Sequence, residues 1–190
     1  MKKAAFFGGD KIAQVYAADR RERIAGLTDL YPDVVSGDNL DRHLPQLGDL
    51  QVIFSTWGFP DLSEEALSQM PSLEIVLYAA GTVKSFARPL LERGIIVEGA
   101  RTAIAMKVAQ FTSAQVLLAC KGYFRIVREF SQPGGQSVYG RIQPGPGYFA
   151  ETVAVLGLGA VGSRVVGQLT GCEMTILAVD PTRTPEEAER

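Results

Sequence analysis

The stretch AVLGLGAVGSRVVGQLTGCEMTILAVDP, residues 154–181, decides how the second half of this chain folds. An apolar strand is expected over Thr152–Leu156, and it runs directly into the hexapeptide Gly157-Leu158-Gly159-Ala160-Val161-Gly162. A segment of helical period and a second apolar strand follow, over Ser163–Leu169 and Thr175–Val179. This order of strand, glycine turn, helix and strand predicts one βαβ unit with two parallel strands.

Each glycine of the hexapeptide has a physical role in such a turn. Gly157 permits the sharp turn off the strand, Gly159 lets backbone approach a pyrophosphate, and Gly162 lets helix and strand pack closely. The phosphates would lie at the helix N-terminus, where unpaired N–H groups and the dipole favour anions. Asp180 ends the second strand, where a carboxylate accepts hydrogen bonds from the adenine-ribose hydroxyls. We therefore predict an adenine-dinucleotide site over residues 157–162 and Asp180.

Asp180 and the spacing of the glycines also indicate which cofactor is bound and which other functions remain open. A carboxylate at Asp180 repels a 2′-phosphate and favours NAD over NADP, while Arg183 keeps NADP open. A methyltransferase is a further alternative, but its GxGxG spacing would require a glycine where this chain has Val161. A glycine-rich turn that binds no ligand is the remaining alternative.

The first half of the chain alternates short apolar runs with amphipathic segments. The expected strands are Ala4–Phe7, Val34–Ser36, Val52–Thr56, Ile75–Tyr78 and Ile95–Val97, and the expected helices lie at 10–25, 38–47, 62–70 and 83–93. The strands are nearly continuous apolar runs, which is typical of a parallel sheet covered on both faces. We predict the α/β fold class, with a flavodoxin-like, doubly wound parallel-sheet domain over residues 1–102.

The second domain, residues 103–190, begins with a different pattern. Residues 103–130 contain few helix breakers apart from Gly122 and predict one long, largely buried helix. Residues 131–149 are rich in glycine and proline and predict a long connection before the βαβ unit. The second domain therefore consists of an interdomain helix, a Pro/Gly-rich arm and the first βαβ unit of an incomplete Rossmann domain.

Composition excludes several classes of partner. The formal net charge is −2 without a block of Lys or Arg, which argues against nucleic acid. No apolar run is expected to reach the ~18 residues of a membrane span. Cys120 and Cys172 are expected to be reduced core residues without a metal, which together with the composition indicates a cytoplasmic protein. His43, the only histidine, lies among polar residues and is expected at the surface.

The whole order resembles the D-isomer-specific 2-hydroxyacid dehydrogenases. Three stretches carry the resemblance: FSTWGFPDLSEEALSQMPSLEIVLYAAGTVKSF at 54–86, GIIVEGARTAIAMKVAQFTSAQVLLA at 94–119 and ETVAVLGLGAVGSRVVGQL at 151–169. The helix entry departs from the family pattern Asn-Ala-x-Pro-Val-Ala-Glu, because residues 104–110 read Ile-Ala-Met-Lys-Val-Ala-Gln. That difference affects the polar contacts at the domain junction and not the fold.

The resemblance implies a substrate site and an assembly. In such enzymes the loop after the fourth strand offers backbone N–H groups to the substrate carboxylate, and its match here is Ala80-Gly81-Thr82. A plain βα turn is the alternative for that loop. Trp57 ends the neighbouring strand and is expected either to wall the same cleft or to pack in the core. The resemblance implies a small 2-hydroxy or 2-keto acid substrate and a homodimer at full length.

Hydride transfer from a 2-hydroxy acid needs a general base and a cation that binds the carboxylate, and no residue of this chain matches either group in the family. The family supplies a catalytic Arg, Glu and His downstream of the second Rossmann strand, so we assign no catalytic residue in this chain. A capping box at Thr184-Pro185-Glu186-Glu187 begins a further helix, and we expect the chain to be the front portion of a longer enzyme. The alternative is a non-catalytic nucleotide-binding or regulatory module that ends at Arg190. An FMN-type function of the first domain is disfavoured, because Gly8-Gly9-Asp10 lacks a hydroxyl-rich phosphate loop.

Overall fold

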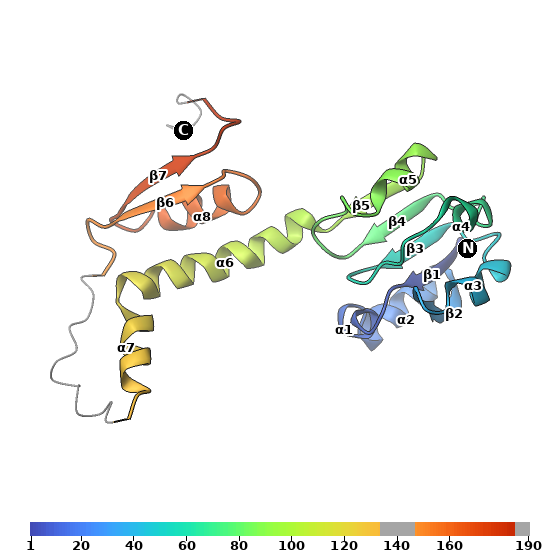
Figure 1. Ribbon diagram of the computed structural model, residues 1–190, viewed down its shortest axis with the longest axis horizontal. Helices are drawn as coiled ribbons and strands as arrows, with labels where there is room; N and C mark the ends of the chain where they lie inside the picture. Colours follow the sequence, from blue (N-terminus) through green and yellow to red (C-terminus); the bar gives the residue numbers. More distant parts are fainter. Residues whose placement is uncertain (134–146, 185–190) are drawn as a thin grey trace. The chain divides into compact units, whose positions relative to one another are not determined.

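The computed structural model describes residues 1–133 and 147–184. The chain consists of two compact units, Met1–Arg101 and Thr102–Arg190, which are described separately (Figure 1). Most of the Pro/Gly-rich arm and three of the four residues of the capping box, 185–187, lie outside the described residues.

Unit 1 is a five-stranded, wholly parallel sheet with the strand order β2-β1-β3-β4-β5 (Figure 1). Its strands are β1 (Lys3–Phe7), β2 (Asp29–Val35), β3 (Val52–Ser55), β4 (Ile75–Tyr78) and β5 (Ile96–Gly99). This order is that of flavodoxin-like doubly wound sheets and confirms the predicted fold class. Phe7, Ile53 and Val76 on three adjacent strands have no exposed surface, so the centre of the sheet forms the core.

The helices of unit 1 are short. They are α1 (Lys11–Val15), α2 (Ala18–Leu27), α3 (Leu40–His43), α4 (Glu64–Ser68) and α5 (Ala87–Glu92), with a 3₁₀ turn over Leu44–Gln46. The helix expected over residues 10–25 is two helices, because Tyr16 leaves the helix and turns toward the sheet. Its hydroxyl donates to the Ser55 carbonyl oxygen (3.0 Å), and burial raises its pKa to about 12.

Strand β2 begins at Asp29, earlier than the expected start at Val34. Pro32 lies inside the strand, and the sequence pattern counts proline against a strand. The strand order explains why it is tolerated. Because β2 is the edge of the sheet, the missing N–H of Pro32 removes no hydrogen bond to a further strand.

His43 is buried, and the expectation of a surface histidine is wrong. The residue is 7% exposed, and its Nδ1 lies 2.8 Å from the hydroxyl oxygen of Tyr31. The Tyr31 hydroxyl donates to Gln46 Oε1 at 3.1 Å, so it accepts from the Nδ1–H of His43. Tyr31 thus connects β2 to the helical segment that follows it, and this polar network satisfies a histidine whose sequence neighbours are polar.

We expect Tyr31→Phe to lower the free energy of unfolding of unit 1 by ~1–3 kcal/mol, because it leaves the buried imidazole of His43 without its partner. Urea unfolding followed by far-UV circular dichroism measures the change. Tyr123→Phe is the matched control, since Tyr123 is 47% exposed and should be close to neutral. Equal midpoints for the two variants would show that the network adds no stability.

Unit 2 contains α6 (Arg101–Cys120), α7 (Tyr123–Phe130), β6 (Thr152–Leu156), α8 (Gly162–Leu169) and β7 (Thr175–Val179), α6 starting at the last residue of unit 1 (Figure 1). Strands β6 and β7 have the bounds that the sequence predicts and pair in parallel. The single helix expected over 103–130 is wrong. Gly122 has a φ of +72°, a left-handed conformation that ends α6 and starts a separate helix.

The expected burial of this helical region is also wrong within the described residues. On α6, Ala105, Ala109 and Ser113 are buried, and the rest of its surface is at least partly exposed. Ala109 packs with Val165 and Leu169 of α8 in a small core. The helix meets α8 along one narrow stripe.

The sheet of unit 2 is covered on one face. Side chains alternate along β6 and β7, and one set packs toward α8 while Leu156, Leu177 and Val179 of the other set are more than half exposed. Parallel strands are ordinarily buried on both faces. Among the described residues, the sheet of unit 2 therefore exposes an apolar face that parallel sheets ordinarily bury.

Helix α6 is long and apolar enough to cross a membrane when judged by length and composition alone, with a mean hydropathy of 1.4 over its best window. This corrects the expectation that no apolar run reaches that length. Lys107 and Gln110 interrupt the apolar sequence of this helix, and a hydropathy average tolerates such interruptions. One such helix is weak evidence for a membrane span, since a mostly buried core helix of a soluble protein passes the same test.

Candidate functional site

The turn after β6 has the geometry that its glycines predict. Gly157 adopts a φ of +92°, which favours glycine, and its N–H donates to the carbonyl oxygen of Val179 at 2.7 Å. A Cβ on Gly162 would overlap the carbonyl oxygen of Gly157 and lie 3.0 Å from its carbonyl carbon. The start of α8 therefore packs directly on the end of β6, and only glycine fits at position 162.

The backbone N–H groups of this turn are available to a ligand. Among the described residues, the N–H groups of Gly159, Ala160, Val161 and Gly162 have no hydrogen-bond acceptor. Two side chains of α8 hold the carbonyl groups of the turn: Ser163 Oγ donates to Leu158 O (2.6 Å) and Arg164 Nη1 to Ala160 O (2.7 Å). With its carbonyl groups occupied and the N–H groups of residues 159–162 unpaired, the turn has the geometry that could hold an anion at the start of an eight-residue helix.

Asp180 lies against the turn. Its Oδ2 accepts from the backbone N–H of Leu158 at 2.6 Å, and its Oδ1 accepts from the N–H (2.8 Å) and hydroxyl (2.6 Å) of Thr182. The carboxylate therefore joins the end of β7 to the turn after β6. The geometry brings together all seven residues of the predicted cofactor site, Gly157–Gly162 and Asp180.

The hydrogen bonds determine the charge state of Asp180. The pKa of its carboxyl group is lowered, first by the Thr182 hydroxyl, then by the backbone N–H groups of Thr182 and Leu158, and to a smaller extent by the charge of Arg183. The group is ionised at neutral pH. Thr182 is not among the predicted site residues, although Asp-Pro-Thr is a signal for an Asx-type turn, in which the aspartate side chain accepts from the N–H two residues further on.

In unit 1, the loop Ala80-Gly81-Thr82 follows β4 at the carboxyl edge of the sheet. Ala80 is buried, and its carbonyl oxygen accepts from the N–H of Ala100 at 3.0 Å, which fixes the start of the loop. Within the part of the chain that the structure describes, the N–H groups of Gly81, Thr82 and Val83 have no acceptor. Three consecutive unpaired N–H groups can accommodate a carboxylate.

Trp57 lies at the end of the neighbouring strand and does not pack in the core. Its residue is 53% exposed, and it follows β3, which pairs with β4 in the register Ser55 to Tyr78. Trp57 and Ala80 each come two residues after that pair, so both lie at the same edge of the sheet. Gly58, with a φ of +86°, turns the chain toward Gly9 of the β1 loop.

The cysteines and His43 do not contribute to the turn at 157–162 or to the loop at 80–82. No group of three or more potential metal ligands occurs among residues 1–133 and 147–184. Cys120 and Cys172 are free and partly buried, and they are not disulfide-bonded to each other. His43, buried against Tyr31, is not exposed for proton transfer.

No family model and no curated protein sequence matches this chain. Solved structures do match. D-mandelate dehydrogenase from Rhodotorula graminis aligns with a TM-score of 0.74 at 16% identity, over 100% of this chain and 59% of its own. A phosphoglycerate oxidoreductase from Rhizobium etli aligns with a TM-score of 0.72 at 19% identity, over 100% and 59%.

D-lactate dehydrogenase from Aquifex aeolicus, solved with NAD and lactic acid, aligns with a TM-score of 0.62 at 22% identity, over 98% of this chain and 54% of its own. The chain thus spans a little more than half the length of the structures that it matches. These identities are low, so what the similarity establishes is architecture. The chain has the fold of the corresponding part of the D-2-hydroxyacid dehydrogenases.

Proposed function

We propose that this chain provides the substrate-binding domain, residues 1–102, and the first cofactor-binding segment, within 103–190, of an NAD-dependent 2-hydroxyacid dehydrogenase. The observation that carries the proposal is the turn at 157–162, whose unpaired N–H groups lie beside the Asp180 carboxylate. The fold shared with two-domain dehydrogenases over more than half of their length supports it. No described residue is assigned the general base or the cation that binds the carboxylate.

The residues of the turn fit a dinucleotide. The pyrophosphate would accept from the N–H groups of residues 159–162, and Gly162 leaves α8 close enough to direct them. Asp180 would accept from the adenine-ribose hydroxyls, and its negative charge disfavours the 2′-phosphate of NADP. When bound, NAD supplies the nicotinamide ring that exchanges a hydride with C2 of the substrate.

The substrate would lie at the carboxyl edge of the unit 1 sheet. Its carboxylate would accept from the N–H groups of the loop Ala80-Gly81-Thr82 and from that of Val83, which are unpaired. Ligands of open parallel sheets bind outside the carboxyl ends of the strands, which is where this loop and Trp57 lie. We therefore propose a small 2-hydroxy or 2-keto acid as the ligand of this loop.

Titration of the purified chain with NAD tests the cofactor half of the proposal. Amide chemical shifts of residues 157–162 and 180 should move on addition of NAD, and move less with NADP. ADP-ribose should reproduce the effect of NAD, because the contacts involve the pyrophosphate and the adenine ribose. If unit 2 gives a folded spectrum and none of the three ligands moves these signals, the cofactor assignment is wrong.

Trp57 offers a direct test of the substrate loop, since it is the only tryptophan of the chain. We expect glyoxylate or pyruvate to quench its fluorescence, because a ligand on residues 80–82 would be bound at the same sheet edge. Gly81→Pro removes one N–H donor and should weaken the quenching. Gly48→Ala is the control that should leave the quenching unchanged, because its added Cβ would meet nothing closer than the Gln69 carbonyl oxygen at 3.8 Å. Quenching that is identical in Gly81→Pro and wild type would place the ligand elsewhere.

We further propose a soluble, cytoplasmic homodimer in which a second copy covers α7. Tyr123, Val127 and Phe130 share one face of this helix, and each is more than two-fifths exposed. Sedimentation equilibrium should therefore give a mass of twice the 20.5 kDa of one chain. Val127→Glu places a charge on the apolar face and should yield monomers. A wild-type chain that stays monomeric at every concentration would contradict this arrangement.

A further inference from the structure

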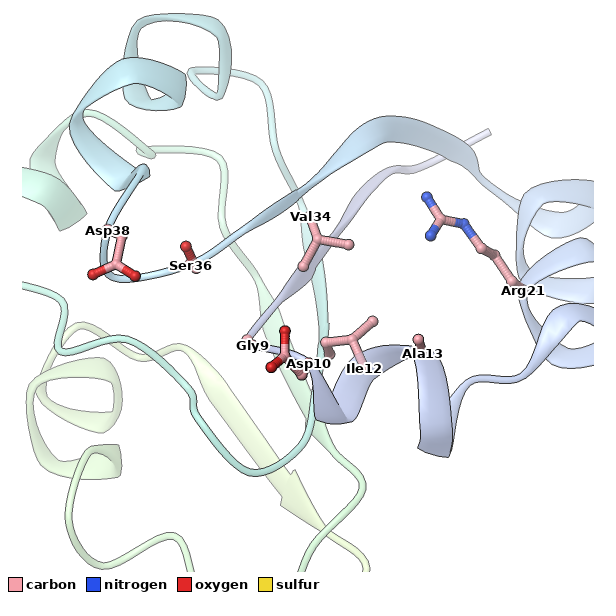
Figure 2. Close-up of a pocket in the computed structure, with 9 residues that line it drawn as sticks. Gly9, Asp10, Ile12, Ala13, Arg21, Val34, Ser36 and Asp38 are labelled. Atoms are coloured by element: carbon pink, nitrogen blue, oxygen red, sulfur yellow. The ribbon is translucent and has the colours of Figure 1, made fainter.

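A pocket of about 370 Å³ lies at the carboxyl edge of the unit 1 sheet, beside the two strands that the proposed dehydrogenase chemistry does not use. It is formed where β1 and β2 end, and its lining is Gly8, Gly9, Asp10, Ile12, Ala13, Arg21, Val34, Ser36 and Asp38 (Figure 2). Its volume falls within the ~300–1,000 Å³ of small-molecule sites. Trp57 and the loop at residues 80–82 are not part of its lining.

The glycines after β1 shape the floor of this pocket. Gly8 has a φ of +151° and donates its N–H to Val35 O at 2.8 Å, which joins the ends of β1 and β2. A Cβ on Gly8 would lie 3.0 Å from Ile12 Cγ1, so the backbone at Gly8 packs closely against the Ile12 side chain. A Cβ on Gly9 would meet nothing within 4 Å. The backbone is therefore constrained at Gly8, and the space over Gly9 is open.

The loop after β2 provides the opposite wall and is held in place. Asn39 Oδ1 accepts from the N–H of Ser36 at 2.8 Å, and Asn39 Nδ2 donates to Val34 O at 3.1 Å. These two bonds fix the backbone from which Ser36 and Asp38 project. Figure 2 shows Asp38 and Ser36 toward one end of the pocket, Arg21 toward the other, and Asp10 between them beside Ile12.

The charges indicate what kind of ligand fits. Arg21 is already engaged, because its Nη2 donates to Pro32 O at 2.9 Å and its guanidinium lies 5.2 Å from the Phe6 ring centroid. Asp10 and Asp38 leave the lining with a net negative charge, which repels phosphate and carboxylate ligands. Carboxylates accept hydrogen bonds from neutral hydroxyl groups, and Ile12 and Val34 add an apolar wall for a flat or aliphatic group.

The arrangement has the same order as the candidate cofactor unit. In each, a strand enters a glycine turn, a helical segment follows, and the parallel second strand leads to an acid, Asp38 here and Asp180 in unit 2. The turn after β1 differs because Asp10 directly precedes α1, and its carboxylate disfavours a phosphate at the start of that helix. We propose that this pocket binds a neutral polyhydroxylated ligand of nucleoside type, with Asp38 and Asp10 accepting from its hydroxyl groups.

Adenosine is the probe, and amide chemical shifts of the intact chain are the measurement. Adenosine should move the signals of residues 8–13 and 34–38, and AMP should do so with about tenfold lower affinity because its phosphate meets the carboxylates. Movement of signals at 157–180 reports the separate cofactor turn, so either site can fail without the other. Shifts at 8–13 and 34–38 that AMP produces as strongly as adenosine, or that only Mg²⁺ produces, would overturn the proposal.

Two variants locate the binding. Gly9→Leu fills the open space without backbone strain and should abolish the adenosine response, whereas Gly26→Leu, also in open space, should retain it. Asp38→Asn removes one acceptor carboxylate and should weaken binding about tenfold, with Asp33→Asn on the same segment as its control. Unchanged affinity in both Gly9→Leu and Asp38→Asn would show that adenosine does not occupy this pocket.

Discussion

Gly162→Ala should destabilise unit 2 and abolish most of its affinity for NAD. The added Cβ overlaps the carbonyl oxygen of Gly157, which is backbone and cannot rotate away. The start of α8 must therefore move off β6, at a cost of ~1–3 kcal/mol that is typical of overpacking. If NAD needs the original geometry, its affinity falls about ten- to a hundredfold.

The matched control is the same substitution five residues further along the same helix. A Cβ on Gly167 meets nothing within 4 Å, and the residue is exposed. Gly167→Ala should stabilise α8 by ~0.5–1 kcal/mol, because glycine is unfavourable inside a helix. Thermal unfolding monitored by circular dichroism, together with calorimetric titration of NAD, gives both quantities for both variants.

The two readouts separate structure from function. If Gly162→Ala unfolds at a lower temperature and wild type does not bind NAD, the packing argument holds and the cofactor proposal fails. If Gly162→Ala unfolds and binds as wild type does, the close approach of α8 to β6 has no energetic consequence. Loss of NAD binding with an unchanged unfolding temperature would indicate that the Cβ obstructs the ligand itself.

The turn of unit 2 could be predicted from the sequence because its determinants are local. The bounds of β6 and β7 follow from apolar runs that a glycine and an aspartate terminate, and Gly157 has the positive φ that its place requires. The presence of an acid after β7 was also predictable. Which N–H groups it would accept from, those of Leu158 and Thr182, depends on how the turn and strand end face each other.

The errors in the prediction arise where distant partners decide the outcome. The polar neighbours of His43 suggest exposure, but Tyr31 on β2 gives its imidazole a buried partner. The apolar content of residues 103–130 suggests burial, but only one stripe of α6 meets α8. A single glycine in a helical pattern does not reveal whether the helix continues, because many helices tolerate one. Here Gly122 adopts a left-handed φ and divides the helix in two.

Asp180→Asn should weaken NAD binding and reduce the preference for NAD over NADP. The carboxylate uses both oxygens, one for Leu158 and one for Thr182, whereas an amide has a single acceptor oxygen and turns donor hydrogens toward one of those N–H groups. The amide therefore cannot keep both the bond from Leu158 and the bonds from Thr182, and the contact between the turn and the end of β7 is weakened. Without the negative charge, a 2′-phosphate is no longer repelled, so the ratio of the two affinities should move toward one.

The pH dependence of the same preference follows from the lowered pKa of Asp180. A carboxyl group whose folded pKa lies below its ordinary value of 3.8 contributes above that value, and its contribution is lost as pH falls through the folded pKa. The contribution of the Asp180 charge to NAD binding should therefore be constant from about pH 8 to about pH 5 and decline only in stronger acid. The preference over NADP should also fall near pH ~6, where the 2′-phosphate takes up a proton and is repelled less. Glu173→Gln, which removes an equal charge before β7, should behave as wild type. If Glu173→Gln lowers the preference as much as Asp180→Asn does, the effect is one of net charge, and the carboxylate at the turn has no specific role in selecting the cofactor.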